Sequence, residues 1–198
     1  MEHTVARSFA DYLCKHDIIC RDYYDIYVYG TELVVSFIFT TSIILFIGLL
    51  TGYFMISITH LLVFIFLRRF TGGYHADTRW KCKIITISTY GLVLLATIAI
   101  NIFWQLYLGL LLVGNLAIGY LAPIENPNKP LTDKEKTKFR VLSHIVFTLL
   151  CILGLSLTSI APIIKNTAFH SLTSVIILMI VAKIAKKVRQ FGVGTRNR

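Results

Sequence analysis

The chain has 198 residues, 56% of them hydrophobic, and its mean hydropathy is +0.70. This composition excludes an ordinary soluble domain and predicts an integral membrane protein. We attribute the net charge of +10 to membrane topology and anionic lipid, and we expect no nucleic-acid partner. The sequence has no phosphate-binding glycine loop and no metal motif, which disfavours an ATP-driven pump, so we expect no cofactor and no metal.

Residues 1–30 are polar and aromatic, with charged side chains throughout, and no cleaved signal peptide is indicated. Their apolar side chains recur at helical spacing with the charged ones largely opposite, so we expect one or two amphipathic helices lying at the membrane interface. These helices would anchor the chain and offer a docking surface. Cys14, His16 and Cys20 match no common zinc spacing, and we expect them to serve packing.

Long runs without charge predict paired membrane spans. Residues 33–67 carry no charged side chain, and as one helix they would be ~52 Å long against a hydrocarbon core of about 30 Å. We therefore expect a hairpin, with its turn at Gly48, Thr51 and Gly52. Residues 84–122 are also too long for one span, and Asn101, Trp104 and Gln105 suit an interfacial turn.

The last two spans would be separated by Pro162, Lys165 and Asn166. The sequence therefore predicts an all-α, polytopic fold with six transmembrane helices after the N-terminal amphipathic helices. We treat residues 1–198 as a single domain, in which residues 31–187 form the bundle and residues 188–198 form a basic tail. The expected spans are residues 31–50, 53–70, 82–100, 105–122, 139–160 and 168–187.

Basic residues are distributed very unevenly between the two expected ends of the bundle. Nineteen of the twenty Lys and Arg residues fall in the N-terminal region, residues 68–83, residues 129–140 or the C-terminal end, and Lys165 alone falls in the other turns. By the positive-inside rule, both termini and both basic loops should be cytoplasmic in a multi-pass protein of a cell membrane. A cytoplasmic location keeps cysteines reduced, so we expect no structural disulfide.

The basic loop at residues 68–83 contains His75, Asp77 and Cys82. Cysteine is a good nucleophile only as its thiolate, and histidine is its usual base. Asp77 fits the N-cap of a helix that starts at about Thr78. Cys82 would then lie in the second turn, where the helix N-terminus and three flanking cations favour the thiolate. These cations are Arg79, Lys81 and Lys83.

On one unbroken helix, His75 and Cys82 would be ~10 Å apart along the axis, too far for proton transfer. A helix that begins after Asp77 removes this problem, because Gly72 and Gly73 can turn the chain so that His75 approaches Cys82. We take His75 and Cys82 as the candidate catalytic pair, the glycines as loop-shaping residues and Asp77 as a capping or orienting residue. From spacing alone, an incidental His and Cys at a membrane boundary is the commoner case.

Arg68-Arg69, Gly73, His75 and Cys82, followed by an apolar span, resemble the signature of the AgrB (accessory gene regulator B) family of bacterial membrane cysteine endopeptidases. Residues 122–130 resemble the proline-rich basic loop of that family, and the likeness in length, hydropathy and segment order extends along the whole chain.

The resemblance implies a quorum-sensing role for the chain. Cys82 would cleave an AgrD-like precursor peptide at the end of its signal segment and hold that segment as a thioester, and a side chain of the peptide would then close a thiolactone or lactone. Homodimers are also implied. The acidic tail of such a precursor would bind basic residues, for which the candidates are Arg68, Arg69, Lys129, Lys134, Lys136 and Lys138.

Two other classes of function remain open from the residues themselves. In a small transporter, the loop of His75 and Cys82 would be a gate or a metal contact, and in a scaffold protein it would have no chemistry. Activity that survives the loss of Cys82 would favour either of these. His60, His144 and His170 lie in or near spans, where we expect neutral histidines hydrogen-bonded between helices.

Overall fold

The computed structural model describes residues 2–72, 79–124, 131–157 and 160–194. Six of the helices in these ranges are long and apolar enough to cross a membrane, which confirms the all-α, six-span fold. The elements in chain order are α1 (Glu2–Lys15), the 3-10 helix η1 (Arg21–Tyr23), α2 (Tyr24–Leu50), α3 (Phe54–Thr71), α4 (Arg79–Ala99), α5 (Trp104–Leu121), α6 (Asp133–Ser156) and α7 (Pro162–Gly194).

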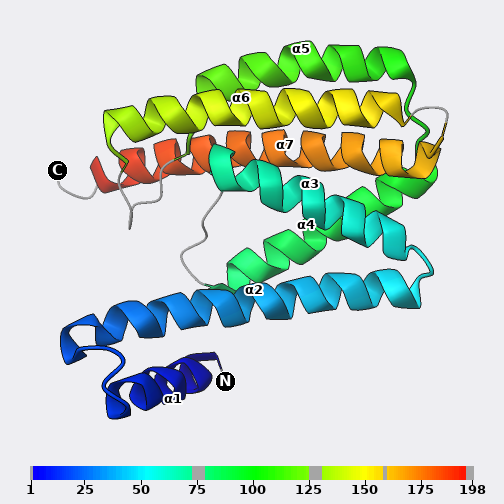
Figure 1. Ribbon diagram of the computed structural model, residues 1–198. Helices are drawn as coiled ribbons and strands as arrows, with labels where there is room; N and C mark the ends of the chain where they lie inside the picture. Colours follow the sequence, from blue (N-terminus) through cyan, green and yellow to red (C-terminus); the bar gives the residue numbers. More distant parts are fainter. Residues whose placement is uncertain (1, 73–78, 125–130, 158–159, 195–198) are drawn as a thin grey trace.

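The longest helix, α7, lies in the middle of the bundle and packs against α3, α4, α5 and α6 (Figure 1). At one edge α5 packs on α6 and α7, and at the other edge α2 packs on α3 and α4. A large buried cluster, centred on Phe147, Leu172 and Met179, joins α3, α5, α6 and α7. A smaller cluster around Ile44, Ile56 and Tyr90 joins α2, α3 and α4.

The N-terminal helix α1 runs beside the first half of α2 (Figure 1). Ala6 and Ala10 are fully buried against Val28 of α2, because small side chains let the two helices approach closely. Nδ1 of His3 lies 2.6 Å from Oε1 of Glu32, whose side chain is buried. Residues 24–30, which we assigned to the amphipathic region, instead form the first turns of α2.

Most expected span boundaries agree with the helices to within a few residues, but the last two spans begin earlier. Helix α6 begins at Asp133 because Thr132 and Glu135 form a capping box, with hydrogen bonds in both directions. Helix α7 begins at Pro162, since proline suits the first position of a helix, where an N–H would have no partner. Lys165 therefore lies in the first turn of α7 and not in a loop.

The turn between α2 and α3 lies at Thr51 and Gly52, where Gly52 has a φ of +76°. The prediction was wrong for Gly48, which is a helical residue that brings α2 close to α3. A Cβ at this position would lie 1.8 Å from Oγ of Ser57. That hydroxyl also forms a buried 2.6 Å hydrogen bond with the hydroxyl of Tyr90, so three helices meet at Gly48.

The basic segments gather at one end of the bundle. The start of α2, the end of α3, the starts of α4 and α6 and the end of α7 all lie there, while the α2–α3, α4–α5 and α6–α7 connections lie at the opposite end (Figure 1). Lys165 is at that opposite end, where its buried Nζ donates to the carbonyl oxygen of Ile102, 2.6 Å away. The six helices thus divide the basic residues as the charge count predicted.

Candidate active site

The thiol of Cys82 lies in the first turn of α4, at the basic end of the bundle. It is free and half-buried. We expected the second turn, and the difference arises because α4 begins at Arg79. His75, Asp77 and Gly73 fall outside the described residues, as does Lys129.

The structure places Arg68 beside Cys82. Arg68 belongs to the last turn of α3, and its guanidinium lies close enough to the Cys82 thiol for a hydrogen bond and a coulombic interaction. The carbon Cζ of Arg68 also lies 5.1 Å from the centre of the Phe64 ring, one turn earlier on α3. The guanidinium therefore lies over the preceding turn of α3.

The sequence assigned Arg68 to tail binding and did not identify it as the neighbour of the nucleophile. Helices α3 and α4 run in opposite directions along the bundle, so the end of α3 and the start of α4 both lie at its basic end. An arginine in the last turn before a helix connection is a signal that could have been used. Arg69, the adjacent residue, is exposed.

One cation that flanks Cys82 in the sequence, Lys83, is directed differently from what we expected. Lys83 is 5% exposed, and its Nζ lies 4.7 Å from the centre of the Trp80 ring and 5.3 Å from that of Phe39 on α2. Contacts with aromatic faces stabilise a partly desolvated ammonium group. Lys83 therefore contributes to the packing of α4 against α2, and Lys81 is exposed.

The end of α3 also contacts the segment after α5. Gly72 and Ile124 form a parallel β-bridge, in which the N–H of Ile124 donates to the carbonyl oxygen of Thr71, 2.9 Å away. Gly72 has a φ of +69°, a conformation that glycine adopts far more easily than other residues. The last residue of α3 is thus hydrogen-bonded to the segment that follows α5.

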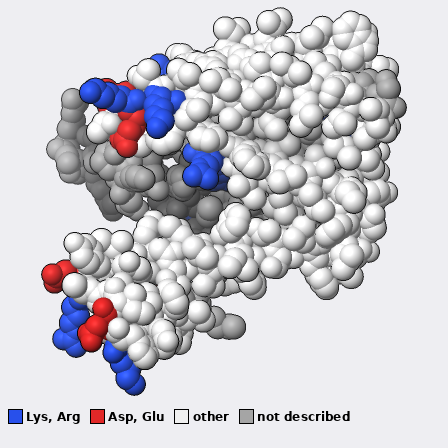
Figure 2. Space-filling view, viewed as in Figure 1, with Lys and Arg blue, Asp and Glu red and all other residues white. Residues whose placement is uncertain are grey.

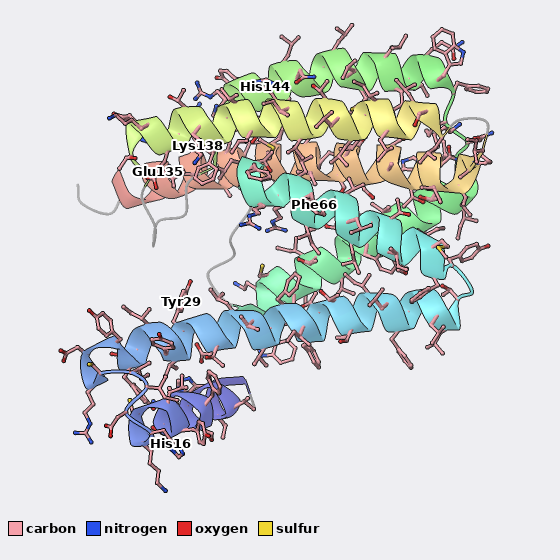
Figure 3. The ribbon with its side chains drawn as sticks, viewed as in Figure 1. His16, Tyr29, Phe66, Glu135, Lys138 and His144 are labelled. Carbon is pink, nitrogen blue, oxygen red and sulfur yellow. The ribbon has the colours of Figure 1, made fainter. Side chains whose placement is uncertain are left out.

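The start of α6 carries the other candidate cations (Figure 3). Lys134 and Lys138 are exposed, whereas Nζ of Lys136 lies 3.4 Å from the carboxylate of Asp133. The carboxylate of Glu135 accepts from the N–H and the hydroxyl of Thr132. Lys134 and Lys138 are therefore the best placed of the three lysines to contact a bound anion.

Figure 2 shows the molecule hollowed at the basic end, between α1 and α2 on one side and the start of α6 on the other. The Lys and Arg side chains that border this hollow lie on its upper side in this view. Tyr29 projects from α2 on the side that faces it (Figure 3).

Two of the three membrane histidines are joined to other helices. Nδ1 of His60 on α3 forms a 2.9 Å hydrogen bond with Oγ of Ser171 on α7, and Nδ1 of His144 on α6 forms a 2.8 Å bond with Oδ1 of Asn115 on α5. The His60 ring also packs against Tyr90 of α4. These contacts agree with the expected interhelical role.

The family model described as "AgrB: Accessory gene regulator B" matches residues 6–187. AgrB-like protein 1 of Clostridium perfringens is 36% identical over 105 residues, which are 52% of this chain and 54% of that protein, so the match spans about half of its length. Accessory gene regulator protein B of Staphylococcus intermedius is 27% identical over 121 residues, or 61% of this chain and 64% of that protein. An AgrB-like protein of Halalkalibacterium halodurans is 25% identical over 136 residues, 68% of each chain. No solved structure was found to match.

Proposed function

Because the chain belongs to the AgrB (accessory gene regulator B) family, we propose that it is a membrane-embedded cysteine endopeptidase that processes a precursor peptide for quorum sensing. The observation that carries this proposal is the position of Cys82. Its thiol lies at the first turn of α4, beside the guanidinium of Arg68 and at the basic end of the bundle. A helix N-terminus and an adjacent cation are the surroundings in which thiolates act as nucleophiles.

In the proposed reaction His75 is the general base, and Cys82 attacks the carbonyl carbon of the scissile peptide bond. The C–N bond breaks, the leaving amine takes the proton held by His75, and the signal segment remains on Cys82 as a thioester. A thiol or hydroxyl within that segment then attacks the thioester carbonyl. His75 takes the proton of that thiol or hydroxyl, the C–S bond to Cys82 breaks, and the Cys82 thiolate is released as a thiolactone or lactone closes.

Arg68 has two roles in this scheme. Its positive charge favours the attacking thiolate, and its N–H groups can donate to the oxygen that becomes negative when the carbonyl is attacked. Asp77 would orient His75 or cap α4, and Gly72 and Gly73 would shape the connection between them. The site lies at the ends of packed spans, where partial exclusion of water protects a thioester from hydrolysis.

The partner would be an AgrD-like precursor with an acidic tail. Lys134 and Lys138 are exposed on α6 and would bind this tail, and Arg69, Lys129 and Lys136 are further candidates for the same role. We place the basic end of the bundle and both termini in the cytoplasm of a bacterial cell, because basic residues are retained on that side of the membrane. The chain would form one AgrB-like domain and would contact anionic lipid at this end. Two copies of the chain would form a homodimer.

The test is co-expression with the precursor candidate encoded beside the gene for this chain, followed by mass spectrometry. The intact chain should yield a cyclic product, and Cys82→Ala should yield uncleaved precursor, since no nucleophile remains. His75→Ala should slow processing by about 10²–10⁴-fold, the usual loss for a general base. A control variant, Cys14→Ala, changes a half-buried free cysteine at the end of α1 and should process normally.

A precursor that lacks its cyclising side chain should accumulate as an adduct that hydroxylamine releases. The adduct should lie on the peptide that contains Cys82. An adduct on Cys20 or Cys151, or normal processing by Cys82→Ala, would show that the nucleophile lies elsewhere and would favour a transporter or a scaffold.

A further inference from the structure

The three residues that follow α5 are fixed against the end of α3. The N–H of Ile124 donates to the carbonyl oxygen of Thr71, 2.9 Å away, and Ile124 pairs with Gly72 in a parallel β-bridge. Thr71 is fully buried and Ala122 is 2% exposed, while Gly72 and Ile124 are half-buried, so the joint is partly shielded from water. Residues about fifty positions apart in the sequence are thereby held together.

This joint requires glycine at position 72. A Cβ built there would lie 2.3 Å from the carbonyl oxygen of Ile124, a distance that real Cβ contacts do not reach. The φ of +69° adds a second cost for any side chain. An alanine at position 72 must therefore displace either the end of α3 or the backbone at Ile124.

Arg140 supports the same joint from α6. Its Nε donates to the carbonyl oxygen of Ala122, 3.0 Å away, while the N–H of Ala122 donates to the carbonyl oxygen of Ile118 at the end of α5. The terminal carbonyl groups of a helix carry partial negative charge and favour a cationic donor. Arg140 is thus occupied with backbone at the end of α5, which distinguishes it from Lys134 and Lys138.

We propose that residues 122–124 are a positioning element for the candidate active site, with Gly72, Ile124 and Arg140 as positioning residues. The proposal rests on the proposed function. Gly72 is the point at which the chain leaves α3 towards His75, and its N–H donates to the carbonyl oxygen of Arg68, one turn earlier. Holding Gly72 in place steadies the turn that presents Arg68 to Cys82.

The test compares Gly72→Ala with Gly91→Ala in the full chain, reconstituted in lipid vesicles and given the precursor that co-expression identifies. Displacing catalytic groups by about 1 Å costs on the order of 10²-fold in rate, so Gly72→Ala should lower kcat by about that factor and change KM less than twofold. Gly91 is the control, because a Cβ there has no atom within 4 Å. Its variant should match the intact chain.

A second readout needs no precursor. Alkylation of Cys82 by iodoacetamide should slow in Gly72→Ala, because the thiol loses correctly placed neighbours, and should be unchanged in Gly91→Ala. An unchanged kcat, or a change confined to KM, would overturn the positioning role. If the intact chain itself leaves the precursor uncut, the proposed function is refuted, and the positioning role that rests on it is refuted too. If the intact chain cuts the precursor and Gly72→Ala cuts it equally fast, only the positioning role is refuted.

Arg140→Gln keeps the test open if Gly72→Ala does not fold. Loss of one charged donor should lower kcat by about tenfold at unchanged KM, whereas Lys138→Gln should raise KM and leave kcat unchanged. Equal effects of the two variants on KM would place Arg140 among the tail-binding cations and refute the inference.

Discussion

Replacement of Arg68 by glutamine gives the most direct test of how the site is built. The guanidinium lies within hydrogen-bonding reach of the Cys82 thiol, and a hydrogen bond to a charged group contributes about 1.5–3 kcal/mol. If this contribution is made mainly to the thiolate and to the transition state, Arg68→Gln should lower the rate of thioester formation by about 10- to 150-fold. Glutamine retains a neutral donor and much of the side-chain volume.

The assay uses the precursor that cannot cyclise. Mass spectrometry measures the rate at which its Cys82 adduct forms in a single turnover. Alkylation of Cys82 by iodoacetamide at a fixed pH supplies a reading without precursor, and it is measured with Cys14 and Cys20 replaced by alanine. Cys151 can remain, because it is fully buried. Both rates should fall in Arg68→Gln, because the thiol loses the neighbouring positive charge.

Arg69→Gln is the matched control, since Arg69 is the adjacent residue on α3 and is exposed. This variant removes one positive charge from the same end of the bundle, but it leaves the guanidinium of Arg68 beside the Cys82 thiol. Loss of the Arg68 contact with the Phe64 ring could lower the thermal stability, so melting is measured for both variants. Equal losses of rate in the two variants would refute a specific role for Arg68 and leave only a general effect of basic charge.

Three other predictions concern the bundle and its basic end. Gly114→Ala places a Cβ 2.2 Å from Cζ of the buried Phe147 and should destabilise the protein by about 1–3 kcal/mol in thermal melts, while Gly109→Ala on the same helix meets no atom within 4 Å and should not. Replacing the exposed Lys134 and Lys138 by glutamine should raise KM for the precursor mainly at low salt, because charges are screened over about 10 Å at 0.1 M; an equal effect at every salt concentration would contradict an electrostatic role. In intact cells and a cysteine-free background, a membrane-impermeant maleimide should label a cysteine at Ile160, which is 82% exposed, but not one at Lys134; the reverse pattern would invert the proposed topology.

The sequence alone determined which segments span the membrane and which end of the bundle is basic. Hydropathy and charge are local sums over residues adjacent in the chain, so a run such as residues 33–67 predicts a helical hairpin without knowledge of its neighbours. Helix boundaries could be read where capping residues are strong signals, as at Thr132, although we placed the start of α6 several residues too late. The pairing of His75 with Cys82 stays a prediction, since His75 lies outside the described residues.

Only the tertiary structure decided which side chains meet. The approach of Arg68 to Cys82, the contact of Gly48 with Ser57 and the bond from Arg140 to the end of α5 each join residues of different helices. Their positions depend on how neighbouring helices pack and rotate about their axes. That packing is set by side-chain shape across the whole interface. Arg140 therefore donates to the end of α5, whereas Lys138, two positions earlier on the same helix, is exposed.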